Sequence, residues 1–159
     1  MVDASFQDGS ENPVRIKAES DADLQIISTL VQDAVGQNSE VSWMPRHRRF
    51  VLMLNRFRWE DKNSASSQGR PFERVQSMLV ISDVLKAAAD GIDSRDKESI
   101  FSVLSIGFEP EKDGAGELVI TLAGDGAIRL KVECLDVCLT DMSRPYKARA
   151  KSAPDHKLD

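Results

Sequence analysis

Residues 20–36 read SDADLQIISTLVQDAVG. Apolar residues recur at every third or fourth position of this stretch, which predicts an amphipathic helix over residues 21–35 with Ile27 and Leu30 at the centre of its apolar face. Ser20 is a suitable N-cap because an acidic residue follows three positions later, as in a capping box. Gly36 can adopt the left-handed conformation that commonly ends a helix.

After this helix the pattern changes to that of strands. Residues 49–59 read RFVLMLNRFRW, and both alternating faces are apolar, which is typical of a strand covered on both sides. A change of parity at Asn55 predicts a bulge there. Further apolar runs predict strands at 14–18, 41–44, 72–81, 100–109, 117–122 and 127–140. The last of these changes parity near Cys134, which predicts a second bulge. Residues 62–70 are polar and predict a loop, whereas residues 85–91 fit either a helix or a strand.

This order of elements predicts an α+β fold. One N-terminal amphipathic helix precedes about seven or eight mainly antiparallel strands, which we expect to form a bent sheet or a partly closed barrel with the helix over one opening. A length of 159 residues suits a single domain. We place this α+β domain at residues 13–146, between a flexible lead-in at 1–12 and a disordered basic tail at 147–159.

Several short motifs carry a resemblance to a known family. They are the apolar helix at 24–35, WMPR at 43–46, the strand at 50–59, RVQS at 74–77, GID at 91–93, FEP at 108–110, ECLD at 133–136 and RPY at 144–146. With these motifs the chain resembles a family of small bacterial proteins of unknown function, found mainly in alphaproteobacteria. The resemblance implies one small domain and no assigned activity, and it favours a strand at residues 85–91.

The charge of the chain is unevenly distributed. The net charge is -5 and the isoelectric point is about 5.1, which is not typical of a nucleic-acid or membrane binder. Residues 42–75 nevertheless carry eight basic and three acidic groups. No apolar run is long enough for a membrane-spanning helix. Two cysteines and an acidic N-terminus without an export signal predict a cytoplasmic location.

The sequence offers few residues for catalysis or metal binding. Zinc sites need a second close pair of ligands, which Cys134 and Cys138 lack because the two histidines, His47 and His156, are far from each other along the chain. The chain has no G-x-S-x-G motif, and its glycine-rich turns precede strands rather than helices. We therefore predict no catalytic residue, no bound metal and no cofactor, and we favour a protein that is not an enzyme.

Arginine and aromatic residues gather in the basic segment. This combination is typical of protein-binding hot spots and of platforms for single-stranded nucleic acid. The plainer alternative is that the arginines pair with acidic residues and the aromatic rings lie in the core. The candidate binding patch consists of Trp43, Arg46, His47, Arg48, Arg49, Arg56, Arg58 and Trp59.

Three functions from different classes follow from these observations. The first is a non-catalytic cytoplasmic domain that binds another macromolecule, preferably a protein. The second is a nucleic-acid-binding protein that uses residues 43–58, which the acidic remainder of the chain disfavours. The third is an enzyme with a site that no motif reveals. We expect no membrane association, and the pattern leaves the oligomeric state open.

Overall fold

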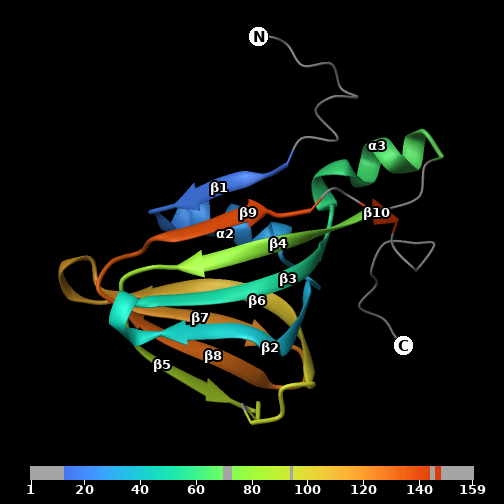
Figure 1. The fold of residues 1–159 in the computed structure, drawn as a ribbon. Helices are drawn as coiled ribbons and strands as arrows, with labels where there is room; N and C mark the ends of the chain where they lie inside the picture. Colours follow the sequence, from blue (N-terminus) through green and yellow to red (C-terminus); the bar gives the residue numbers. More distant parts are fainter. Residues whose placement is uncertain (1–12, 70–72, 94, 144–145, 148–159) are drawn as a thin grey trace.

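The chain folds into one bent antiparallel sheet with a helix against it. The computed structural model describes residues 13–69, 73–93, 95–143 and 146–147 (Figure 1). The predicted lead-in at 1–12, and the predicted tail except for residue 147, lie outside these described residues. Within them, nine strands follow one another in the sheet, and a two-residue strand, β10, pairs with β4 beside that path. The α+β class with an antiparallel sheet is confirmed, whereas the expected seven or eight strands are too few.

The elements have the following bounds. In chain order they are β1 (Arg15–Ala18), α2 (Asp21–Leu30), β2 (Val35–Met44), η1 (Pro45–His47), β3 (Arg49–Phe57), η2 (Trp59–Asp61), α3 (Lys62–Ser67), β4 (Glu73–Ile81), β5 (Val84–Asp90), β6 (Ile100–Pro110), η3 (Lys112–Gly114), β7 (Gly116–Leu122), β8 (Gly126–Val132), β9 (Val137–Asp141) and β10 (Tyr146–Lys147). In space the nine strands of the path are ordered β1-β9-β4-β3-β2-β6-β7-β8-β5, so β1 and β5 are the two ends of an unclosed sheet.

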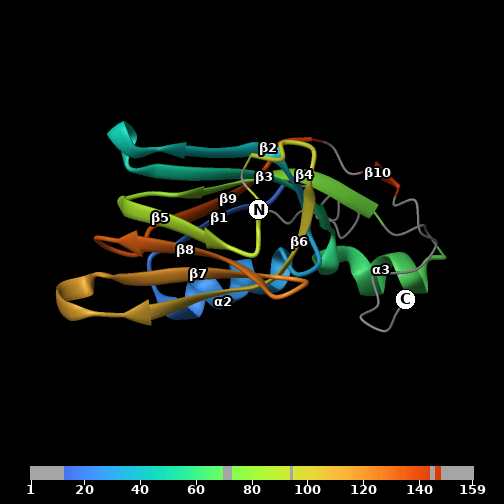
Figure 2. The same cartoon turned by 90° about the horizontal axis from the view of Figure 1, so that it is seen from below.

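The sheet bends where β2 meets β6. Only three residues of β2, at 35–37, pair with β6, and the rest of β6 pairs with β7. A register shift between Val103 and Ser105 lets β6 turn from one part of the sheet into the other. The strands β1, β9, β4, β3 and β2 therefore face the strands β7, β8 and β5 across a common core (Figures 1 and 2).

Helix α2 packs against β6 and β1 at one side of this core. Leu24 and Ile27 are fully buried, whereas Leu30, the last residue of the helix, is only half-buried. The backbone N–H of Ile106 in β6 donates a hydrogen bond to Ser28 Oγ at 2.9 Å, which fixes the helix on the sheet. The helix covers one side of the core, and the opposite side opens between β2 and β5.

The predicted start of the helix is confirmed, but its predicted end is wrong. Ser20 is the N-cap, and its hydroxyl accepts a hydrogen bond from the N–H of Asp23 at 3.2 Å. The helix ends at Leu30 rather than at residue 35. Gly36 does not end it, since this glycine lies inside β2, where a Cβ would be 2.4 Å from Cζ of Phe101. The glycine is therefore needed for close packing rather than for a left-handed turn.

Four other local predictions also need correction. The predicted strand at 127–140 is two strands, since β8 pairs with β7 and β5 while β9 pairs with β1 and β4. The parity change near Cys134 marks this crossing between two parts of the sheet, not a bulge. The bulge expected at Asn55 is absent, because β3 pairs with β4 in unbroken register from Phe50 to Phe57. The predicted loop at 62–70 contains the short helix α3, and the ambiguous segment 85–91 lies mostly in strand β5.

Candidate functional site

The structure does not bring the eight residues of the candidate patch together. The four at 46–49 are exposed on the tight turn between β2 and β3, which includes η1. Trp43 is half-buried near this turn and contacts Phe50, with the two ring centroids 6.2 Å apart. Arg56, Arg58 and Trp59 lie at the far end of β3. Binding by the exposed residues stays a prediction, but the eight side chains do not form one surface.

Arg56 is the centre of a buried cluster of charges. Its guanidinium is 0% exposed and donates to both carboxylate oxygens of Glu60, at 2.9 and 2.8 Å. It also donates to both oxygens of Asp141, at 3.1 and 3.0 Å. Burial alone would lower the pKa of Arg56, but the hydrogen bonds and charges of the two carboxylates raise that pKa above its ordinary value. Arg56 is therefore a fixed cation inside the protein.

The cluster joins segments that are distant in the sequence. Asp141, at the end of β9, accepts hydrogen bonds from Ser77 Oγ at 2.6 Å and from the N–H of Val14 at 2.7 Å. Arg58 is almost fully buried and forms an ion pair with Glu73 at the start of β4. Arg56 and Arg58 therefore join the ends of strands β3, β4 and β9 through ion pairs. This is the plainer alternative given above, in which the arginines pair with acidic residues of the protein itself.

Trp59 also has a packing role. Its indole N–H donates to the carbonyl oxygen of Gln32 at 3.0 Å, and its ring meets that of Phe57 edge to face, with centroids 4.7 Å apart. A satisfied indole N–H and an aromatic partner are usual for a tryptophan in a partly buried position. Trp59 thus packs at the end of β3, away from the exposed arginines.

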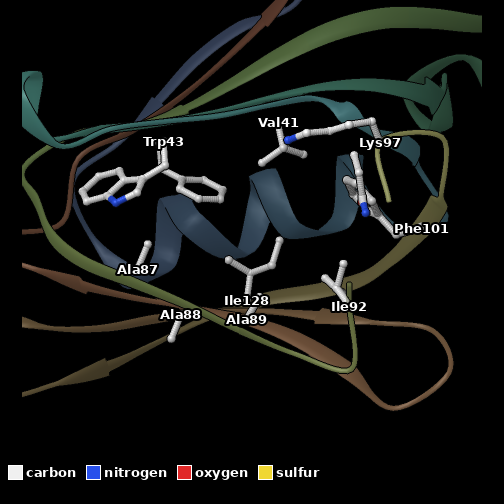
Figure 3. Close-up of a pocket in the computed structure, with 11 residues that line it drawn as sticks. Val41, Trp43, Ala87, Ala88, Ala89, Ile92, Lys97, Phe101 and Ile128 are labelled. Atoms are coloured by element: carbon white, nitrogen blue, oxygen red, sulfur yellow. The ribbon is translucent and has the colours of Figure 1, made fainter. Parts of the chain in front are cut away.

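An apolar groove opens between β2 and β5, on the side of the core opposite α2 (Figure 3). Its cavity volume is about 350 Å³. The lining residues come from strands that are far apart in the chain, and most of them are apolar. They are Val41, Trp43, Phe50, Ala87, Ala88, Ala89, Ile92, Phe101 and Ile128, with Asn38 and Lys97 as the polar members. This size and lining suit a small apolar group or a few side chains of an extended peptide.

One wall of the groove is the end strand of the sheet. Residues of an antiparallel strand direct their N–H and C=O groups alternately to the two sides. The N–H of Glu133, just after β8, donates to the carbonyl of Asp83 at 2.9 Å, so the backbone groups of Glu133 point toward β5. The backbone groups of every second residue before it in β8, including those of Arg129, therefore point toward β5 as well. Ala88 opposite Arg129 is then bonded to β8, and the N–H and C=O groups of Ala87 and Ala89 point away from β8 to the open edge.

The opposite wall is also a strand edge. The N–H of Arg58, just after β3, donates to the carbonyl of Glu73 in β4. The backbone groups of every second residue before Arg58 in β3, including those of Phe50, therefore point toward β4. Trp43 lies opposite Phe50, and its own N–H and C=O groups, like those of Val41, therefore point away from β3. Since β6 pairs with β2 only at residues 35–37, this second edge also borders the groove.

The sequence did not single out the alanines of this edge. The run Lys-Ala-Ala-Ala at 86–89 was ambiguous because alanine favours helices by propensity, whereas the surrounding sheet imposes a strand. The available signal was the small size of three consecutive side chains in a segment for which the family resemblance favoured a strand. Such side chains leave the backbone of an edge accessible.

The cysteines lie apart from the groove wall. Both are free thiols; Cys134 is exposed and Cys138 is half-buried. In the part of the chain that the structure describes, no group of three His, Cys, Asp or Glu side chains is arranged to hold a metal ion. Over the same residues, no helix is both long and apolar enough to cross a membrane.

Cys134 should react slowly with alkylating reagents. Its thiol donates a hydrogen bond to Asp83 Oδ2 at 3.1 Å, and this bond, with burial and the nearby acidic charges, raises the pKa of Cys134 to about 11. Because the thiolate is the reacting form, the rate with iodoacetamide at pH 8 should be roughly a hundredfold below that of an ordinary thiol. The measurement uses a Cys138→Ser background, in which Cys134 is the only thiol.

The variant Asp83→Asn provides the control. Asparagine tolerates the left-handed backbone of Asp83 (φ 57°) but removes the charge, so the rate at pH 8 should rise by about tenfold or more. The rate in the parent should increase with pH up to about 11. An unchanged rate in Asp83→Asn would show that this carboxylate does not control the thiol.

The chain belongs to a family described as "Protein of unknown function (DUF2948)", whose sequence model matches residues 14–156. This match confirms the resemblance to a family of unknown function. No curated protein and no solved structure matched the chain.

Proposed function

We propose that this domain binds an extended segment of another protein by adding it as a strand to the open edge of β5. The observation that carries the proposal is the pair of backbone positions at Ala87 and Ala89, whose N–H and C=O groups face an apolar groove. In strand addition, main-chain hydrogen bonds give affinity and pockets for alternate side chains give specificity. The groove supplies such a pocket between Trp43 and Ile128.

The two ends of the sheet differ in a way that supports this proposal. Exposed edges are usually protected by short length and by charged side chains, especially lysine. The end strand β1 has four residues, of which Arg15 and Lys17 are exposed and basic. The other end strand, β5, has seven residues and presents three alanines in its middle. An accessible edge beside an apolar groove is typical of a site for a partner strand.

The nucleic-acid alternative has less support. Two of its five arginines, Arg56 and Arg58, are buried and paired with carboxylates. Arg48 forms an exposed ion pair with Glu133 at 2.7 Å. The aromatic ring of Trp59 is at the other end of β3 from the exposed arginines. A stacking platform combined with phosphate contacts would need these groups on one face.

The variant Ala89→Pro should fold and lose strand binding. The N–H of Ala89 points to the open edge, so proline there removes no hydrogen bond to β8, and the residue is exposed. Its ring should block pairing and weaken binding of extended peptides about tenfold. The peptides are selected from a displayed library of random nine-residue sequences on the parent protein, and their affinity is measured by fluorescence anisotropy.

The matched control is Ala88→Pro. Here the lost N–H is one that bonds to β8, so this variant should lower the free energy of unfolding by about 1 kcal/mol or more. The proposal fails if the library yields no peptide with alternating apolar residues. It also fails if selected peptides bind Ala89→Pro as tightly as the parent.

A further inference from the structure

The groove has opposite charge at its two ends. At the η1 end, the N–H of Val84 donates to the carbonyl of Arg48 at 2.9 Å, which places this turn beside the first residue of β5. The ionisable side chains here are Arg46, Arg48, Arg49 and Lys86, with Asp83 and Glu133 as the acids. Bases therefore exceed acids at this end. Arg48 and Glu133 are paired with each other.

The other end of β5 has an excess of acids. The strand ends at Asp90, and the chain then forms a segment from which Ile92 and Lys97 line the groove. The described ionisable residues of this segment are Asp90, Asp93, Asp96 and Glu98, with Arg95 and Lys97 as the bases. A segment bound along β5 would thus run between a basic and an acidic end.

The direction of such a segment follows from the sheet. β5 begins beside the turn that follows β2, where the N–H of Val84 donates to the carbonyl of Arg48. The chain just after β5 lies beside the first half of β2, where the side-chain amide of Asn38 donates to the carbonyl of Asp93 at 3.1 Å, so the two strands run antiparallel to each other across the groove. A strand that is antiparallel to β5, the edge with which it is proposed to pair, therefore runs parallel to β2. Of the two directions along β5, the antiparallel one is slightly more stable per residue. The N-terminal end of the added strand would lie beside residues 90–98, and its C-terminal end beside η1.

We infer that the groove selects a partner segment with basic residues before an apolar β-type core and acidic residues after it. The inference rests on the proposed function, and it specifies the chemistry and direction of the partner. Basic residues would lie by the acidic segment 90–98, and acidic residues by Arg46 and Arg49. The reverse arrangement would place like charges together at both ends, which disfavours the wrong partner.

Two peptides of identical composition test the inference. They are Lys-Lys-Val-Thr-Val-Thr-Val-Glu-Glu and its charge-reversed counterpart, Glu-Glu-Val-Thr-Val-Thr-Val-Lys-Lys, each with an acetylated N-terminus and an amidated C-terminus so that only side chains carry charge. The five-residue core spans about 16 Å at roughly 3.3 Å per residue. Both peptides have zero net charge, so non-specific attraction to the acidic protein is equal.

We expect the first peptide to bind the full chain about tenfold more tightly at low salt, with a difference that shrinks as salt is added. The double variant Arg46→Glu and Arg49→Glu, which changes two exposed side chains, should abolish this preference. Ala89→Pro should weaken both peptides alike.

Equal binding of the two peptides, or tighter binding of the second, would overturn the inferred direction and leave strand addition standing. Failure of both peptides to bind at millimolar concentration would overturn strand addition itself.

Discussion

Replacing Arg56 by alanine is expected to lower the free energy of unfolding by about 3–5 kcal/mol, the usual cost of removing one partner from a buried ion pair. The side chain of Asp141 is only 2% exposed and would be left buried without the guanidinium that pairs with it. Glu60 would lose both of its short hydrogen bonds to Arg56. Equilibrium unfolding in urea, followed by tryptophan fluorescence, measures the loss.

The double variant Arg56→Leu and Asp141→Leu separates the cost of an unpaired charge from the cost of a changed shape. Replacing both charges by apolar side chains commonly restores much of the stability. We therefore expect the double variant to be more stable than Arg56→Ala. If Arg56→Ala lost less than about 1 kcal/mol, the cluster would be behaving like an exposed surface pair.

Ile27→Ala should lower the free energy of unfolding by about 2–5 kcal/mol, because it leaves a cavity that the packed core fills only in part. Ile27 is 0% exposed and belongs to the face of α2 that packs into the core. Its neighbour Ile26 is 51% exposed, although it has the same side chain and lies in the same helix.

Ile26→Ala is thus a matched control that removes the same atoms from the same helix without opening a cavity. It should change stability by no more than about 0.5 kcal/mol, as is usual for a surface substitution. Both variants are measured by urea unfolding in parallel. Equal losses in the two would mean that the helix does not pack on the sheet through the face that contains Ile27.

Features set by neighbouring residues could be predicted from the sequence. Ser20 caps the helix through the N–H of Asp23, a contact over three residues, and apolar alternation located most strands. The change of parity near Cys134 was also detected, but a bulge and a crossing between two parts of a sheet shift the pattern in the same way. Only the pairing partners distinguish them, and these lie far away in the chain.

The candidate site was harder to predict than the fold, because it depends even more on contacts between residues that are distant in the chain. Arg56 has the same strand parity as Leu52 and Leu54, which was a signal that it points inward. Its partner Asp141 is on another strand, so the burial of the pair could not be predicted from the segment alone. The groove is formed by edges of β2 and β5 that no local pattern places side by side. Alanine, the residue that leaves the β5 edge open, has no strong strand signal of its own.

The position of β1 at one end of the sheet links folding to the order of synthesis. Among the described residues, this strand joins the sheet through β9 alone, where Arg15 lies opposite Thr140, and Asp141 completes the contact by accepting the N–H of Val14. The ribosome therefore releases β1 long before the strand that must hold it. Until β9 emerges, β4 also has an open edge toward the growing chain. Contacts between such distant residues form slowly, so β1 and β4 each keep an unpaired edge, which favours aggregation, until β9 is free to pair with both.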